Sequence, residues 1–242
     1  KNGGGRRVLL LESTDWIGGQ LTSQAVPPDE HRWIGEQGCT ASYREYRRQI
    51  RSHYRNLPGF SPKIKIKEAF CPADSEVSHL SHPPKLALET LEKMLAPYKA
   101  DGTLTVLTGV RYLSAEVSGD RIRSVTCEKD GERFTVTGEM FLDGTDTGEL
   151  IALCGAEYRT GAESRAETGE PHAPEFPNPA DMQPVTYTAA IENRRTGDFV
   201  IPKPDGYDDF RRLRMPYDDY PVFSMFGPDS STGRAKRFGM FE

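Results

Sequence analysis

Two segments far apart in the chain each place an acidic residue after an apolar run and ahead of glycines. In the first segment, the run Arg6–Glu12 ends on Glu12 and is followed by Gly18 and Gly19. A carboxylate at a strand end can accept hydrogen bonds from ribose hydroxyls, and glycines let the backbone come close to a ligand. Glu12 alone is better explained as an ordinary turn acid at a strand end, but its spacing from the two glycines favours nucleotide binding.

The second segment follows an expected strand at Met140–Leu142 and runs from Asp143 to Glu149 as DGTDTGE. It is compatible with two chemistries. One is a glycine turn beside the ribityl or pyrophosphate part of a cofactor, where amides at a helix start face negative charge. The other is a phosphatase with a nucleophilic aspartate two residues before Asp143. That position holds Phe141, so the phosphatase interpretation is rejected.

Composition excludes several classes of protein. The 242 residues carry a net charge of -5, which gives no indication of a nucleic-acid partner. No apolar run approaches the ~18 residues of a membrane span, so no membrane association is expected. The cysteines form no C-x-x-C pair, and we predict neither a disulfide framework nor a metal site. Scattered, reduced thiols favour a cytoplasmic location, while the oligomeric state leaves no signal in the sequence. The cysteines are Cys39, Cys71, Cys127 and Cys154.

The first half of the chain predicts one strand, a long loop and two helices. Val8–Leu11 is uniformly apolar, as in a strand buried on both faces of a parallel sheet. Residues 15–39 form a long loop, and Ser42 opens a capping box that starts a helix ending near Arg55. A second helix starts at Pro83-Pro84 and ends at Asp101-Gly102. The first helix buries Tyr43, Tyr46, Ile50 and Tyr54. Arginines surround that stripe on a face that is either solvated, which we favour, or anion-binding: Arg44, Arg47, Arg48, Arg51 and Arg55.

The second half predicts mostly strands. Leu104–Leu107 is rich in β-forming residues, and three alternating segments follow between residues 111 and 137. Asp130-Gly131 is a strong signal for a two-residue hairpin turn, so these segments form a β-meander. A short helix is expected at Glu149–Cys154, and a further strand is possible at Thr186–Ile191.

Several separated motifs, taken together and in order, resemble a family of bacterial FAD-dependent oxidoreductases within the glutathione-reductase-like flavoprotein superfamily. The motifs are VLLLE–TDWIGGQL, PPDEHRWI, SYREYR, FLDGTDTGEL and GAEYRTGAESRAETGEPHAPE, between about Arg6 and Glu175. The resemblance implies FAD as cofactor, a small organic substrate, and transfer of a hydride or electron pair between them. It implies that Glu12 holds the adenosine ribose and that the Val110 region packs near the adenine. The implied FAD-contacting residues are Glu12, Gly18, Gly19, Gln20, Val110, Gly144, Thr145, Asp146 and Gly148.

Catalytic residues are expected in the polar segments of this resemblance, although a structural role is an open alternative for each of them. The candidates are His31, Arg44, Arg165 and His172. Bound flavin carries most of the chemistry in such enzymes, and the protein orients the substrate and tunes charge. The rival interpretation is a non-catalytic nucleotide-binding or carbohydrate-associated module that kept the scaffold.

The predicted fold class is α/β. We expect a partial Rossmann-like FAD/NAD(P)-binding domain over residues 1–155, with an inserted helical segment at 40–100 and a β-meander at 111–137. Residues 156–242 would begin a substrate-binding α+β domain. A ribose-binding acid lies about 20 residues after the phosphate loop, so counting back from Glu12 places that loop and its strand before Lys1. We therefore expect the chain to be part of a larger protein and to be inactive by itself.

Overall fold

The computed structural model forms two compact units, Lys1–Ala189 and Ala190–Glu242. It describes residues 6–59, 61, 63, 70–73, 75, 78–183, 185, 187–189, 194, 196–214, 220–229 and 232–238. The helix end expected at residues 1–5 lies outside this range. The domain boundary expected near residue 155 stays a prediction.

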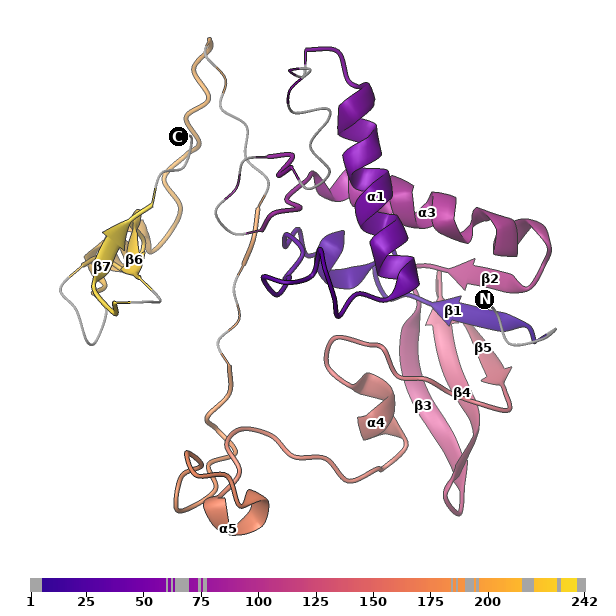
Figure 1. Cartoon of the computed structure of the whole chain (residues 1–242). Coiled ribbons are helices and arrows are strands. Elements are labelled where there is room, and N and C mark those ends of the chain that lie inside the picture. The colour runs from indigo at the N-terminus through magenta and orange to yellow at the C-terminus, as the bar shows by residue number, and fades with distance from the viewer. Residues whose placement is uncertain are drawn as a thin grey trace. The chain divides into compact units, whose positions relative to one another are not determined.

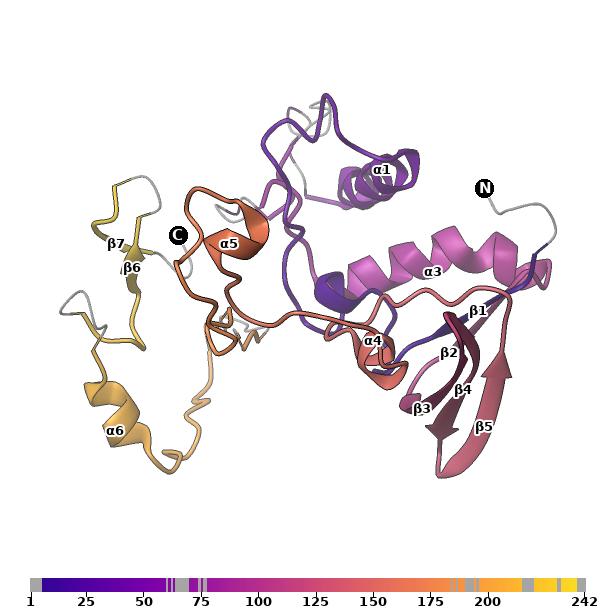
Figure 2. The ribbon, with the colours of Figure 1, turned by 90° about the horizontal axis from the view of Figure 1, so that it is seen from below.

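The first unit contains a parallel strand pair. β1 (Val8–Leu11) lies beside β2 (Leu104–Leu107) with Val8 opposite Leu104, so both predicted strands are confirmed. Helix α3 (Pro84–Ala100) runs along one face of the pair, and the meander lies on the other (Figures 1 and 2). The prediction that this strand is buried on both faces was wrong at the start of β1, where Val8 is 54% exposed and Leu9 is exposed as well.

The β-meander is confirmed. β3 (Arg111–Ser118), β4 (Arg121–Lys129) and β5 (Glu132–Thr137) form an antiparallel sheet in that order. Asp130 and Gly131 both have positive φ, 53° and 83°, as the two-residue turn between β4 and β5 requires. The meander packs on the parallel pair through an apolar cluster, which fixes the end of β1 against the sheet. The cluster is built on Val110, Val125 and Cys127, with Leu11 and Leu107 packed against it.

Helices α1 (Ala41–Asn56) and α3 pack together around a second core. Its buried members are Tyr46, Ile50, Leu80 and Ala87. The capping residue of α1 is Thr40 rather than Ser42, because the Thr40 hydroxyl accepts a hydrogen bond from the Tyr43 amide at 3.2 Å. Proline suits the first turn of α3, since its missing N–H has no partner within the helix there.

Short helical turns lie in the segments that connect or follow these helices and strands. A 3-10 turn, η1, spans Gly19–Leu21, and α4 (Glu149–Leu153) confirms the short helix predicted there. Met140–Leu142 is not a strand: within the described chain no strand pairs with it, and Leu142 is 87% exposed. α5 (Arg165–Thr168) is a single turn that begins with a capping box between Ser164 and Glu167.

The second unit contains one short helix and one hairpin among its described residues. α6 spans Tyr207–Arg212, and β6 (Phe226–Pro228) pairs antiparallel with β7 (Ala235–Arg237). The possible strand at Thr186–Ile191 belongs mainly to the first unit. Residues 187–189 have no regular structure, and residues 186, 190 and 191 lie outside the described range.

Candidate functional site

Glu12 lies at the carboxyl edge of the parallel pair, directly after β1. Its amide donates to the Leu107 carbonyl at 2.9 Å, and its carbonyl accepts from the Val110 amide at 3.0 Å. One carboxylate oxygen, Oε1, accepts from both the amide and the hydroxyl of Thr14, at 2.8 and 2.9 Å. Within the described chain the other oxygen, Oε2, has no hydrogen-bond partner. Glu12 therefore combines a fixed orientation with an acceptor that a ligand hydroxyl can use.

Gly18 and Gly19 serve different purposes. Gly18 has φ 111°, and a Cβ there would lie 2.6 Å from Leu91 Cδ1 and 2.9 Å from Thr22 Cγ2. Close packing of η1 against α3 therefore explains Gly18 without a ligand. Gly19 has φ 50°, and its Cβ would point to Asp146 Oδ1 at 3.6 Å. Gly19 thus faces the second predicted cofactor segment.

Asp143 organises the turn that precedes α4. Its Oδ1 accepts from the amide and hydroxyl of Thr145 at 2.9 and 2.7 Å, and its Oδ2 accepts from the Ile151 amide at 3.0 Å. The Thr145 hydroxyl in turn accepts from the Glu149 amide at 2.8 Å. Burial raises the pKa of Asp143, but hydrogen bonds from Thr145, Ile151 and Leu150 outweigh it and lower that pKa overall. Sequence reasoning did not include Asp143 among the site residues, although it shapes the turn.

The two glycines of this turn also differ. Gly148 has φ 68° and precedes α4, a backbone conformation that favours glycine. Gly144 lies outside the left-handed region, and a Cβ there would meet nothing within 4 Å. Within the part of the chain that the structure describes, no neighbouring atom requires glycine at this position. An exposed backbone without a side chain fits close approach of a cofactor.

The structure brings the two predicted segments together. Gln24 Nε2 donates to Asp146 Oδ2 at 2.6 Å, a contact between residues 122 positions apart in the chain. Sequence reasoning missed Gln24, because no local pattern reveals a partner so distant. Gln20 is exposed on η1, between Gly19 and Gln24. The Gly18–Gly19 turn and the Asp143–Gly148 turn therefore form adjoining parts of one surface.

Tyr112 lies near both predicted acids. Its hydroxyl donates to the Leu11 carbonyl at 2.9 Å, next to Glu12. Burial raises the pKa of Tyr112 to about 12, with further contributions from the charges of Glu12, Cys127, Glu149 and Asp143. Glu12 and Asp143 therefore both raise the pKa of the same phenol. Val110 is fully buried in the apolar cluster below Glu12, so the expectation that the Val110 region packs near the adenine stays a prediction.

His31 and Arg44 lie on neighbouring elements but do not form a pair. His31 Nδ1 accepts from the Trp33 amide at 3.2 Å, and a Cβ on Gly38 would lie 2.8 Å from His31 Nε2. His31 thus fills the turn of its own loop while remaining exposed to solvent. Arg44 is exposed near the start of α1.

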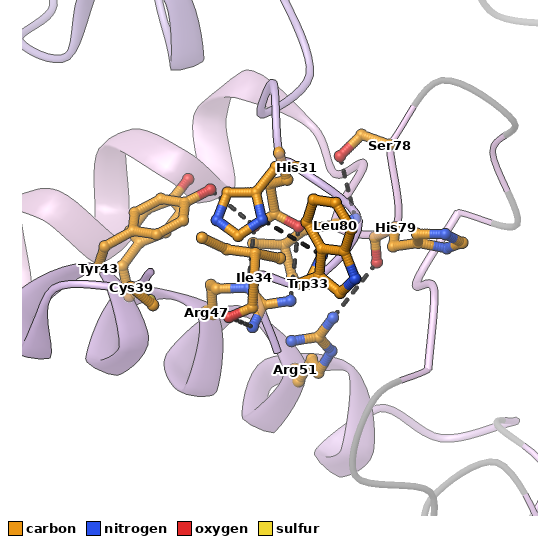
Figure 3. Close-up of polar contacts among 12 residues, drawn as sticks. His31, Trp33, Ile34, Cys39, Tyr43, Arg47, Arg51, Ser78, His79 and Leu80 are labelled. Carbon is orange, nitrogen blue, oxygen red and sulfur yellow. Dashed lines mark hydrogen bonds and ion pairs between the residues drawn. The ribbon is translucent and has the colours of Figure 1, made fainter. Parts of the chain in front are cut away.

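A buried ion pair attaches this loop to α1, and sequence reasoning missed it. Arg47 Nε contacts Glu30 Oε1 at 2.9 Å, and the two side chains are only 9% and 5% exposed. The Tyr43 hydroxyl donates to the same oxygen at 2.8 Å, and burial followed by this contact raises the pKa of Tyr43. Figure 3 shows Tyr43, Arg47 and Arg51 on the helix side of the loop. The prediction of a solvated arginine face was therefore wrong at Arg47 and Arg51, which are buried.

Arg165 and His172 share one compact segment. The segment is closed by a bridge between Ala162 and Asn178, and Arg165 Nη2 donates to the Ala173 carbonyl at 3.2 Å. His172 is exposed. A pocket of about 210 Å³ in the same segment has neither residue in its lining. Its charged lining residues are Arg159, Glu163 and Glu167.

The described residues contain neither a membrane-spanning helix nor a metal-binding cluster. No helix there has the length and apolar character needed to cross a membrane. No cluster of three or more histidine, cysteine, aspartate or glutamate side chains there is arranged to hold a metal ion.

A mixed α/β arrangement with two adjoining glycine turns at a sheet edge is consistent with an FAD-binding domain. A family model described as FAD dependent oxidoreductase matches residues 3–227. The chain belongs to this family of FAD-dependent oxidoreductases. FAD is therefore its expected cofactor, and family membership supports a general FAD-linked redox function. Comparisons with curated proteins and with solved structures gave no match.

Proposed function

We propose that residues 1–155 belong to a Rossmann-like FAD-binding domain of the glutathione-reductase-like superfamily. In the active protein this domain passes a hydride or electron pair between FAD and a small organic substrate. The observation that supports this best is the junction of two glycine turns at one sheet edge through Gln24 and Asp146. The predicted boundary with a substrate domain from residue 156 is part of the same proposal.

The proposed cofactor contacts follow from the groups available at this edge. Glu12 Oε2 accepts a hydrogen bond from a ribose hydroxyl, while Thr14 holds the other carboxylate oxygen. Gly19 and Gly144 allow the backbone to approach the cofactor. The Val110 region packs near the adenine, with Val110 itself buried in the cluster beneath. The remaining contacts come from residues of the same two turns: Gly18, Gln20, Thr145, Asp146 and Gly148.

Bound FAD supplies the two-electron chemistry, and this chain supplies orientation and charge. Glu12 also selects between nucleotides, since a carboxylate facing the ribose 2′-hydroxyl repels a 2′-phosphate. We propose that substrate is oriented by the exposed polar residues outside the cofactor turns. The candidates among them are His31, Arg44, Arg165 and His172.

The test is the identity of the nucleotide carried by the purified protein. Denaturation should release FAD, recognised by its mass, and neither NAD nor NADP. Recovery of NAD or NADP in its place would overturn the cofactor assignment. Anaerobic bleaching of the flavin absorbance by an organic substrate would separate an oxidoreductase from a non-catalytic module.

A further inference from the structure

Gln24 makes a contact that neither glycine turn requires for its own shape. The Asp143–Gly148 turn is held by Asp143 and Thr145, whose hydrogen bonds do not include the Asp146 side chain. Within the described chain, the 2.6 Å bond from Gln24 Nε2 is the side-chain hydrogen bond that Asp146 makes. The contact therefore fixes the direction of the Asp146 carboxylate rather than the backbone that carries it.

The backbone around Gln24 is closely determined. The backbone N–H of Gln24 donates to the Gly19 carbonyl at 3.2 Å, and the backbone N–H of Val26 donates to the Gln20 carbonyl at 2.9 Å. Ala25, the next residue, has φ 54°, in the left-handed region that costs a residue with a Cβ some stability. A strained backbone maintained beside Gln24 keeps its side chain directed across the gap between the two turns.

A side-chain amide suits position 24 because it is neutral and can donate a hydrogen bond. A lysine or arginine would neutralise Asp146, and a glutamate would repel it. The neutral Gln24 amide instead occupies Oδ2 and leaves Asp146 anionic. The other oxygen, Oδ1, lies on the Gly19 side, where a Cβ would be only 3.6 Å away. Oδ1 is therefore presented as an acceptor for a ligand hydroxyl beside a residue without a side chain.

We propose that Gln24 is a positioning residue for FAD, acting through Asp146. It orients the Asp146 carboxylate so that one oxygen faces the Gly19 backbone and accepts a hydrogen bond from a cofactor hydroxyl. Gln24 itself does not touch the reacting atoms. This inference rests on the proposed function, because it assigns the surface between the two turns to FAD.

The test exchanges the amide and the carboxylate. Gln24→Glu places two carboxylates together and should weaken FAD binding about tenfold. In Asp146→Asn, the side-chain amide of Gln24 still donates to the oxygen at position 146. The new amide nitrogen at position 146 therefore faces the cofactor in place of an acceptor, which should weaken FAD binding by about as much. In the double variant, the carboxylate introduced at position 24 accepts from the amide introduced at position 146, and the oxygen of that amide again faces the cofactor. We expect the double variant to bind within about threefold of the parent.

FAD affinity is measured by flavin fluorescence titration of the cofactor-free protein, with circular dichroism to show that each variant is folded. Gln49→Glu is the matched control. Gln49 Nε2 also donates to a carboxylate, Glu45 Oε1, at 2.8 Å, but on α1 away from both turns. The control should bind FAD as the parent does.

Three outcomes overturn the positioning role. If Gln24→Glu binds FAD as tightly as the parent, the amide does not orient Asp146, although FAD binding itself stands. If the losses of the two single variants add in the double variant, the two side chains act independently. These measurements use the full-length protein, and if the full-length parent takes up no FAD, the proposed function fails and this inference fails with it.

Discussion

At the scale of single residues, the same local motif occurs in places with different roles. Glu12, Asp101 and Asp143 each accept hydrogen bonds from the amide and the hydroxyl of a threonine two positions later. Asp101 precedes β2, whereas Glu12 follows β1, so these acids lie at opposite edges of the parallel pair. The motif therefore establishes the turn, and only the position in the sheet bears on ligand binding.

This contrast makes Glu12→Ala an interpretable variant. Loss of a hydrogen bond to a charged acceptor should cost on the order of 1.5–3 kcal/mol of FAD affinity. Retention of FAD after dialysis is the measurement. Asp101→Ala removes the same turn hydrogen bonds without a cofactor and should retain FAD like the parent. Equal loss of FAD in both variants would reduce Glu12 to a turn residue.

Alanine at two glycines should separate folding from cofactor binding. Gly18→Ala introduces a Cβ at φ 111°, 2.6 Å from Leu91 Cδ1, and should destabilise the fold by roughly 1–3 kcal/mol. Gly144→Ala meets nothing within 4 Å and should change stability by less than about 0.5 kcal/mol. Urea unfolding measures the first effect. FAD titration should show weaker binding for Gly144→Ala, and unchanged binding would remove Gly144 from the cofactor site.

The surroundings of His82 lead us to expect that the free energy of unfolding depends on pH. It lies between the Tyr46 hydroxyl, 2.6 Å from Nε2, and the Leu80 carbonyl beside Nδ1, which suits a neutral ring. Burial lowers the pKa of His82, although the Leu80 carbonyl and the charge of Glu30 oppose that shift. Below the ordinary value of about 6.5, the unfolded state binds the proton more readily, so stability falls as pH falls. His82→Asn should flatten the dependence of unfolding free energy on pH in this range, and an unchanged slope would contradict the argument.

At the scale of elements, the loop before α1 owes its place to charge rather than to apolar packing alone. Glu30 receives hydrogen bonds from Tyr43 and Arg47, and Arg47 Nη1 also donates to the Ile34 carbonyl at 3.4 Å. The loop residues His31 and Trp33 are exposed above this attachment. A candidate substrate-orienting residue therefore depends on a buried ion pair for its position.

Breaking that pair should be costly. Glu30→Ala leaves Arg47 buried without its partner and should lower the free energy of unfolding by about 3–5 kcal/mol. Glu45→Ala removes an exposed ion pair with Arg48 on the same helix and should cost less than about 1 kcal/mol. Urea unfolding of both variants provides the comparison. Similar losses in the two variants would show that burial adds nothing to the Glu30–Arg47 interaction.

Elements with a local signal could be predicted from the sequence. The turn at Asp130-Gly131 needs only two residues with positive φ, and the alternation around it gave the meander correctly. The starts of α1 and α3 were expected within two residues, because capping and proline signals are local. The two proposed cofactor turns were singled out as short acid–glycine patterns, and family membership supports FAD as the cofactor, while the contacts themselves stay a prediction.

Features set by distant partners could not be predicted. Arg47 and Arg51 border the apolar stripe of α1, and helical periodicity cannot tell that Glu30 and the Phe70 carbonyl cover them. Met140–Leu142 has strand-like composition, but composition does not supply a neighbouring strand. Gln24 carries no signal of its own, because its partner Asp146 is 122 positions away.

At the scale of the whole molecule, the two units differ in their tryptophan content. The chain has two tryptophans, Trp16 and Trp33, and both belong to the unit Lys1–Ala189. Tryptophan fluorescence therefore follows this unit alone. The unit also contains all of the proposed cofactor residues.

FAD should stabilise the tryptophan-containing unit selectively. At a free concentration 100-fold above its dissociation constant, FAD should add about 2.7 kcal/mol. That gain should raise the melting temperature seen by tryptophan fluorescence by roughly 5–10 °C. Riboflavin, which lacks the adenosine half that Glu12 is proposed to hold, should give a smaller shift. No shift with FAD would place the cofactor site outside this unit.

The turn between β3 and β4 gives the chain a practical point of attachment. Gly119 and Asp120 are exposed, and a Cβ on Gly119 would meet nothing within 4 Å. Exposed hairpin tips tolerate added residues because no buried backbone depends on them. A fluorophore or a short epitope inserted at this turn would report on the protein while leaving Glu12, the glycine turns and the Glu30 attachment as they are.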